Sequence, residues 1–251
     1  MANEQRFTDR AGSYAKGRMG YAQGVVELIL GEILRPGDKI ADVGSGTGIF
    51  AREFMARGFD VYCVEPNGDM RARAEAQFTS DPHFISVAAT AESTTLPDHS
   101  VALVTAASAF HWFDPDKFRA ECLRILKPGG AVFTVINARG DGDPFSRAQH
   151  AICARLCPGF TSLHHGLDEA IPKFEGFFGE NLRHAEFDFP LEYTKEKFIA
   201  RCLSSSYAPK PGMDTYEEYV GALNALLEEY APDADKLTVS NRSVAYWGRL
   251  A

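Results

Sequence analysis

Residues 39–48, Lys-Ile-Ala-Asp-Val-Gly-Ser-Gly-Thr-Gly, join a short apolar run to three glycines at every second position. The apolar run, residues 39–43, is bounded by turn formers and is typical of a strand buried on both faces of a parallel sheet. Gly44, Gly46 and Gly48 permit backbone angles that other residues avoid, and they leave no side chain between the peptide and a ligand. A glycine-rich loop that ends a strand and opens a helix predicts a nucleotide-binding site.

Strands and helices alternate on both sides of this loop. The hydrophobic pattern predicts a helix over residues 23–34 before the first strand. Further strands are expected at 60–65, 84–88, 101–106 and 131–136, with helices near 48–57, 68–78 and 115–126 and a turn at 127–130. Strict alternation of this kind predicts an α/β Rossmann-like fold with a doubly wound, mostly parallel sheet. Ligands bind such sheets outside the carboxyl ends of the strands.

The alternation weakens beyond residue 138. Helices are expected near 145–157, 195–205 and 215–230, with an extended piece over 182–193. This region predicts a helical cap inserted before the end of the sheet. The closing segment, residues 236–250, has strand-like alternation. We expect it to return to the sheet as an antiparallel final strand.

Composition excludes several classes of partner. The formal net charge of −8 and the pI of about 5.4 argue against binding to nucleic acid, which relies on clustered Lys and Arg. No apolar run approaches the roughly 18 residues of a membrane span, and residues 1–6 are polar, so we expect a cytoplasmic protein with no membrane partner. The sequence leaves the oligomeric state open.

The five cysteines are odd in number and widely spread, which favours reduced, buried thiols over a disulfide framework. Cys153 and Cys157 lie four residues apart on an expected helix. A metal pair there would need a second pair of ligands at suitable spacing, and the sequence offers none. We therefore expect no metal.

The spacing of the glycines discriminates between cofactors. A dinucleotide fingerprint places its third glycine at position 49, which is Ile49 here. Asp42 stands two residues before Gly44, where a carboxylate would repel a pyrophosphate but could hold a ligand with cationic groups. S-adenosylmethionine carries an ammonium and a sulfonium and no phosphate. Glu65 ends the next strand, a position from which an acidic residue accepts hydrogen bonds from ribose hydroxyls.

Four stretches together resemble the class I S-adenosylmethionine-dependent methyltransferases of the type 11 group: residues 40–50, 65–70, 91–97 and 123–130. The resemblance spans residues 38–137. It implies that Gly44 and Gly46 border the methionine part of the cofactor, that Glu65 holds the ribose, and that residues near the adenine follow the second and third strands. The cofactor site implied in full is Tyr14, Asp42, Gly44, Ser45, Gly46, Glu65, Pro66, Asn67, Met70, Ala91, Glu92 and Ala107.

The methyl acceptor is expected beside residues 107–114, which follow the fourth strand. His111 is a candidate general base because its unperturbed pKa lies near neutrality, and the alternative is a histidine that plugs the pocket or bonds a backbone carbonyl. The string His111, Trp112, Phe113 is similar to methyltransferases that resemble trans-aconitate methyltransferase, which act on carboxylates. A carboxylate needs no base. The resemblance therefore implies a small-molecule acceptor, with a carboxylate oxygen as the candidate atom.

Residues 7–18 resemble the lid helix of this family, in which Tyr14 would cover the cofactor. Arg18 could meet an acidic group of the acceptor or be a solvated arginine. Tyr207 and Trp112 are further candidate acceptor contacts. The expected organisation is an N-terminal lid over 1–36, a binding core over 37–139, a substrate-selecting cap with an added sheet strand over 140–235, and the return strand over 236–251.

Two other functions fit the same fold. One is an NAD-dependent oxidoreductase, which Ile49 and Asp42 disfavour. The other is a non-catalytic protein that binds S-adenosylmethionine. Such a protein would keep the glycine loop but would have no pocket continuous with the methyl position.

Overall fold

The computed structural model describes residues 20–139, 142–163, 165–205 and 207–250. The chain divides into two compact units. The first unit contains residues 1–136, 166–187 and 243–251, and the second contains residues 137–165 and 188–242. The segment 166–187, which falls in the region expected to form the cap, belongs to the first unit. The four-part organisation expected from the sequence stays a prediction.

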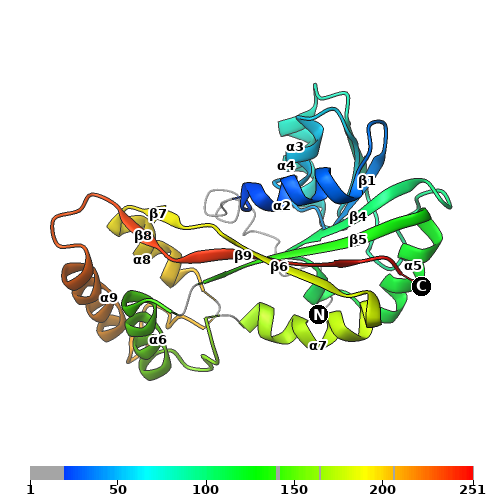
Figure 1. Cartoon of the computed structure of the whole chain (residues 1–251). Helices are drawn as coiled ribbons and strands as arrows, with labels where there is room; N and C mark the ends of the chain where they lie inside the picture. The colour runs from blue at the N-terminus through cyan, green and yellow to red at the C-terminus, as the bar shows by residue number, and fades with distance from the viewer. Residues whose placement is uncertain (1–19, 140–141, 164, 206, 251) are drawn as a thin grey trace. The chain divides into compact units, whose positions relative to one another are not determined.

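A seven-stranded sheet forms the centre of the fold, in the order β3-β2-β1-β4-β5-β9-β6 (Figure 1). The strands are β1 (Lys39–Val43), β2 (Asp60–Val64), β3 (Phe84–Val87), β4 (Val101–Ala107), β5 (Leu126–Arg139), β6 (Arg183–Asp188) and β9 (Asn241–Gly248). The pairs β1 with β2, β1 with β4, β2 with β3 and β4 with β5 are all parallel. Strand order reverses at β1, so the predicted doubly wound, mostly parallel sheet is confirmed.

The last strand runs against its neighbour β5. Phe133 stacks on Trp247 with ring centroids 5.7 Å apart, and the Thr134 hydroxyl donates to the Tyr246 carbonyl at 3.1 Å. The contacting residue on β9 thus has a lower number when the residue on β5 has a higher one, so the two strands are antiparallel. Figure 1 shows the two arrows pointing in opposite directions. The expected antiparallel strand begins at Asn241, because residues 237–239 form β8 (Leu237–Val239), which pairs with β7 (Leu191–Tyr193) in a separate two-stranded sheet.

The prediction of a turn at residues 127–130 is wrong. These residues are part of β5, and they are accommodated by a shift in register against β4. Val101 lies opposite Leu126, whereas Leu103 lies opposite Ala131. The extra residues bulge out of the ladder, and Gly129 supplies the positive φ of 80° that such a bulge favours. The Pro-Gly-Gly run predicted a turn because the same residues are favoured in turns and in β-bulges.

Helices of the first unit pack around an aromatic core. They are α2 (Gln23–Leu28), continued by the π-helix η2 (Ile29–Ile33), then α3 (Ala51–Met55), α4 (Gly68–Phe78), the 3-10 helix η3 (Phe110–Trp112), α5 (Pro115–Ile125) and α7 (His165–Phe178). Helix α3 begins three residues later than expected because Gly48 has a φ of 79°, outside the helical range. Phe110 is buried against Phe174 and Phe177, at 4.8 and 5.1 Å between centroids.

The second unit has its own hydrophobic core. It is built by α6 (Pro144–Leu156), α8 (Lys195–Leu203) and α9 (Tyr216–Tyr230) together with β7 and β8. Cys153, Cys157 and Cys202 lie in this core, and burial raises the pKa of the Cys202 thiol to about 11. All five cysteines are buried free thiols, as expected for a chain without disulfides.

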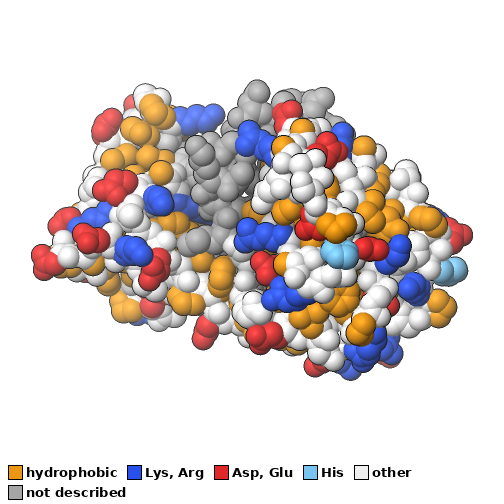
Figure 2. All heavy atoms as spheres, turned by 90° about the horizontal axis from the view of Figure 1, so that it is seen from above, with side chains coloured by type: hydrophobic (Ala, Val, Ile, Leu, Met, Phe, Trp, Pro, Cys, Tyr) orange, Lys and Arg blue, Asp and Glu red, His pale blue; other side chains and the backbone are white. Residues whose placement is uncertain are grey.

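Charged side chains of both signs lie close together on the face of the molecule seen from above. Figure 2 shows acidic and basic side chains intermixed over the described part of the visible face. Among the described residues, no helix is both long and apolar enough to span a bilayer.

The loop glycine Gly48 provides a test of the fold. A Cβ at this position would lie 2.6 Å from Cε2 of Phe78, and its φ of 79° disfavours any L side chain. We expect Gly48→Ala to lower the free energy of unfolding by about 1–3 kcal/mol, as measured by urea denaturation. Gly37→Ala is the control, since Gly37 has a φ of 85° but a Cβ there would meet no described atom within 4 Å. An equal loss in both variants would show that the contact with Phe78 is unimportant.

Candidate active site

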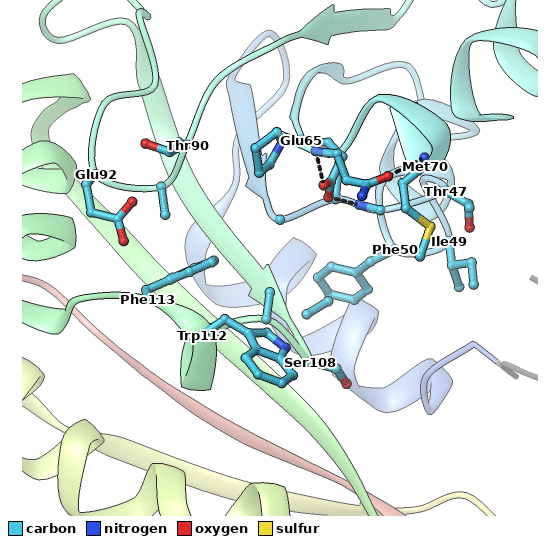
Figure 3. Close-up of a pocket in the computed structure, with 18 of the residues that line it drawn as sticks. Thr47, Ile49, Phe50, Glu65, Met70, Thr90, Glu92, Ser108, Trp112 and Phe113 are labelled. Carbon is cyan, nitrogen blue, oxygen red and sulfur yellow. Dashed lines mark hydrogen bonds between the residues drawn. The ribbon is translucent and has the colours of Figure 1, made fainter. Parts of the chain in front are cut away.

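The glycine loop is tied to the end of the neighbouring strand. The backbone N–H groups of Gly44 and Ser45 both donate to the carbonyl of Val64, the last residue of β2, at 2.8 and 3.2 Å. Glu65 follows directly. Its Oε2 accepts the N–H of Gly46 at 2.9 Å, and its Oε1 accepts the N–H of Asn67 at 2.8 Å (Figure 3). One carboxylate therefore joins the loop after β1 to the turn after β2.

Two glycines of the loop face different surroundings. A Cβ on Gly44 would lie 2.7 Å from the Cβ of Ala109 and 3.2 Å from Cζ of Phe113, so this glycine is required for packing. A Cβ on Gly46 would meet no described atom within 4 Å. Gly46 therefore presents bare backbone to open space, which is the arrangement that lets a ligand approach the peptide closely.

Asp42 is buried beneath the loop. Its side chain is 1% exposed, and its Oδ1 accepts the hydroxyl of Thr105, the residue beside it on β4, at 2.7 Å. Its Oδ2 has no hydrogen-bond partner among the described residues, and neither has the buried Oγ of Ser45. Burial raises the pKa of Asp42 to about 7, with the nearby charge of Glu65 adding to the rise and the Thr105 hydrogen bond opposing it. Of these two residues, Ser45 is the one that also lines the cavity over the loop, where an unsatisfied hydroxyl suits a polar ligand.

A cavity of about 230 Å³ lies over the loop, within the first unit. Ten residues expected to bind the cofactor line it: Gly44, Ser45, Gly46, Glu65, Pro66, Asn67, Met70, Ala91, Glu92 and Ala107. Trp112, an expected acceptor contact, lines the same cavity. Residues that follow the ends of neighbouring strands thus meet in one place.

Other predicted site residues lie elsewhere. Asp42 sits behind the loop and does not line the cavity, and His111 is also absent from the described lining. The His111 ring packs on Trp112 at 4.7 Å, and its carbonyl accepts a hydrogen bond from Lys173 at 3.3 Å. Tyr207 belongs to the second unit. Tyr14 and Arg18 lie outside the described residues.

Eight further lining residues were not named individually as contacts from the sequence, although Ser108, Ala109 and Phe113 fall within the stretch 107–114 expected beside the acceptor. They are Tyr21, Thr47, Ile49, Phe50, Thr90, Ser108, Ala109 and Phe113. Thr47, Ile49 and Phe50 flank the glycines, so their proximity to the loop was a usable signal. Tyr21 was not foreseeable, because it is 87 residues from Ser108, to whose Oγ its hydroxyl donates at 3.1 Å.

Ser108 has an uncommon backbone conformation for a residue other than glycine. Its φ is 52°, and its N–H donates to the carbonyl of Val135 on β5 at 2.7 Å. Such residues cost free energy and persist where the surrounding structure holds them, often at functional sites. Here the conformation turns the chain at the end of β4 so that residues 107–109 border the cavity.

The raised pKa of Asp42 predicts a pH-dependent stability. The folded protein binds the Asp42 proton more tightly than the unfolded chain, whose carboxyl has a pKa near 3.8. The protonated Asp42 carboxyl therefore stabilises the folded protein fully below pH 3.8, and this stabilisation is lost as the pH rises to about 7. The free energy of unfolding changes by up to about 4 kcal/mol over this range. We expect Asp42→Asn to remove it, so that the stability of the variant relative to the wild type increases between pH 4 and pH 8.

Urea denaturation of both proteins across this range measures the difference, and other titrating groups cancel in the comparison. Thr105→Val is the companion variant, because loss of its hydrogen bond should move the transition of Asp42 to higher pH. A stability difference between wild type and Asp42→Asn that is constant with pH would contradict the assignment.

Known proteins similar to this chain include methyltransferases, and the similarity covers the segment that forms most of this site. Residues 41–134 match a family model described as methyltransferase domain. An uncharacterised methyltransferase of Mycobacterium tuberculosis is 33% identical over 135 residues, which are 54% of this chain and 53% of that protein. An uncharacterised methyltransferase-like protein of Schizosaccharomyces pombe is 28% identical over 230 residues, 90% of this chain and 85% of that protein. The chain spans about half the length of the mycobacterial relative.

Solved structures share the fold. A protein of Anaeromyxobacter dehalogenans assigned to the type II methyltransferases has a TM-score of 0.69 at 22% identity, covering 92% of this chain and 97% of the other. Phosphoethanolamine N-methyltransferase 2 of Haemonchus contortus, bound to S-adenosyl-L-methionine, has a TM-score of 0.53 at 18% identity, covering 100% of this chain and 61% of the other. The family match is thus confined to residues 41–134, and the solved structures show that the fold of the chain is shared.

Proposed function

We propose that this chain is an S-adenosylmethionine-dependent methyltransferase that acts on a small-molecule acceptor. The observation that carries the proposal is the bare backbone of Gly46, held by Glu65 at a cavity in which ten residues expected to bind this cofactor meet. When bound, S-adenosylmethionine supplies an electrophilic methyl group on a sulfonium. The Haemonchus contortus enzyme with the same fold binds this cofactor.

The chemistry of the described lining fits this cofactor. Its charged side chains are Glu65 and Glu92, and no Lys or Arg is among the described residues that line the cavity. A pyrophosphate would be repelled there, whereas a ligand with an ammonium and a sulfonium is attracted. The buried Oδ2 of Asp42 is an unused acceptor behind the same loop, as judged from the described residues. The NAD-dependent alternative is disfavoured on these grounds.

Different residues of the lining would contact the ribose, the adenine and the sulfonium of the cofactor. Glu65 would accept hydrogen bonds from the ribose hydroxyls. Asn67 and Met70 would contact the adenine from the start of α4, and Glu92 with Ala91 would lie beside its amine. Trp112 and Phe113 form an aromatic wall that excludes water and whose faces attract a cationic sulfur.

The acceptor requires in-line approach to the methyl carbon, so positioning supplies much of the rate. We propose a carboxylate oxygen as the acceptor atom, on the likeness of His111-Trp112-Phe113 to carboxylate methyltransferases. A carboxylate is already ionised and does not depend on His111 as a base. The described lining contains no cation to hold it, so a counter-charge for the acceptor must come from outside this lining.

Cofactor binding can be tested by titration calorimetry with S-adenosylhomocysteine. We expect Glu65→Gln to weaken binding about 10- to 100-fold, because a buried carboxylate that accepts charge-assisted hydrogen bonds is lost. Asp42→Asn should also weaken binding. Glu75→Gln is the matched control, since Glu75 is an exposed residue of α4 that contacts Arg71 and Ser86. Unchanged affinity in both site variants would refute the assignment.

Activity can be tested by screening small carboxylates, phenols and amines for release of S-adenosylhomocysteine. Transfer to carboxylates that persists in His111→Gln is the expected result. Stabilisation against heat by NADH but not by S-adenosylhomocysteine would support the oxidoreductase instead. Binding of S-adenosylhomocysteine without transfer to any acceptor would support a non-catalytic binding protein.

A further inference from the structure

A residue with a hydroxyl, Ser108, lines the cavity where β4 ends. It follows Ala107, the last residue of the strand, and it shares the lining with Trp112. Figure 3 shows Ser108 on the side of the cavity opposite Glu65 and Met70. Ser108 therefore lies away from the residues proposed to contact the ribose and the adenine, and within the stretch beside which the methyl acceptor is expected.

Tyr21 holds the Ser108 side chain. Its hydroxyl donates to Ser108 Oγ at 3.1 Å, and both residues belong to the first unit. The Tyr21 ring packs edge-on against the buried ring of Phe50, with 5.0 Å between the centroids. The next residue, Ala22, donates its N–H to Oγ of Ser243 on β9 at 2.9 Å. Contacts with two parts of the first unit thus fix Tyr21, and Tyr21 in turn fixes the Ser108 hydroxyl.

The backbone of Ser108 is also held in place. Its N–H donates to the carbonyl of Val135 at 2.7 Å, and its φ is 52°, a conformation that residues other than glycine adopt at a cost. A hydroxyl has one proton to donate and two lone pairs that accept. Because Ser108 Oγ accepts from Tyr21, its own proton points elsewhere, and none of the residues that the structure describes accepts it. A fixed hydroxyl of this kind suits a ligand that accepts a hydrogen bond.

We infer that Ser108 donates a hydrogen bond to the methyl acceptor and that Tyr21 is a positioning residue that acts through Ser108. The acceptor is the carboxylate of the proposed function, on which this inference rests. In the lining as the structure describes it, no side chain carries a positive charge. Within this lining, a neutral donor therefore has to orient the acceptor.

The role of Ser108 follows from the two oxygens of a carboxylate. One oxygen would accept from Ser108 while the other attacks the methyl carbon. A lone pair of the attacking oxygen forms the new bond as the carbon–sulfur bond breaks, and the electron pair of that bond stays on sulfur. The products are a methyl ester and S-adenosylhomocysteine, and no proton moves. Because the carboxylate loses its charge during transfer, the hydrogen bond is strongest before transfer, so its loss should raise KM more than it lowers kcat.

Steady-state kinetics test this role, with benzoate, succinate and citrate as acceptors. We expect Ser108→Ala to raise the KM of a carboxylate that the wild type methylates about 10- to 100-fold, because a hydrogen bond to a charged group is lost. Tyr21→Phe should raise this KM about 2- to 5-fold, and the double variant should match Ser108→Ala, since Tyr21 acts through Ser108. Ser100→Ala should keep the wild-type KM, because Ser100 precedes β4 at its other end and donates to the carbonyl of Pro97.

Titration calorimetry on the same variants separates this role from cofactor binding. The affinity for S-adenosylhomocysteine should stay within about twofold of the wild type, since the lost bond is to the acceptor. A loss of this affinity as large as the rise in KM would place the pair on the cofactor and overturn the inference. If Ser108→Ala does not fold, Ser108→Gly decides, because glycine adopts a φ of 52° without strain and also lacks the hydroxyl.

The remaining outcomes distinguish the inference from the proposed function. Failure of the wild type to bind S-adenosylhomocysteine, or to methylate any of the screened acceptors, would contradict the proposed function itself. An unchanged carboxylate KM in Ser108→Ala, or methyl transfer only to acceptors without a carboxylate, would overturn the role of Ser108. A further rise in KM when Tyr21→Phe is added to Ser108→Ala would show that Tyr21 does not act through Ser108.

Discussion

The hydrogen bonds that fix the glycine loop to the end of β2 are the constraint on which the site depends. Two loop N–H groups share the carbonyl of Val64, and a third is held by Glu65. These bonds need the parallel pairing of β1 with β2, which brings the carboxyl ends of both strands to one edge. They also set the positive φ angles of Gly44 and Gly46, and those angles decide which glycine packs against Ala109 and which one faces the cavity. Hydrogen bonds from the protein itself hold the loop in this conformation, which reduces the entropy lost on binding.

Much of the fold was predictable because its signals are local. The apolar runs of β1, β2 and β4 are short and bounded by turn formers. Helices α4 and α5 are capped by Asn67 and Asp114, whose side chains accept from the backbone of the first turn. The bulge in β5 was not predictable. Its Pro-Gly-Gly run has the composition of a turn, and only the pairing with β4 makes it part of a strand. The late start of the return strand has a similar cause, since β8 finds its partner in β7, about 45 residues away along the chain.

In the candidate site, too, features with a local signal were predictable and features that depend on long-range packing were not. Residues next to a strand end were foreseeable, Glu65 from its spacing after β1 and Asn67 from the family resemblance. Tyr21 was not, because its place in the cavity depends on how distant parts of the chain pack together. The role of His111 stays a prediction, and the described lining of the cavity contains its neighbours Trp112 and Phe113 rather than His111 itself.

The order of strands in the sheet has a consequence for how the chain is made. β5 ends at Arg139, but its neighbour on one side is β9, which begins at Asn241, and β6 joins the sheet through β9. On a ribosome, β1 to β5 emerge and can pair long before residues 241–248 are synthesised. During that interval β5 presents an open edge of unpaired backbone groups, which is a template for association with other chains. Completion of the sheet, and protection from aggregation, therefore wait for the synthesis of β9, and chaperones have most to contribute before that stage.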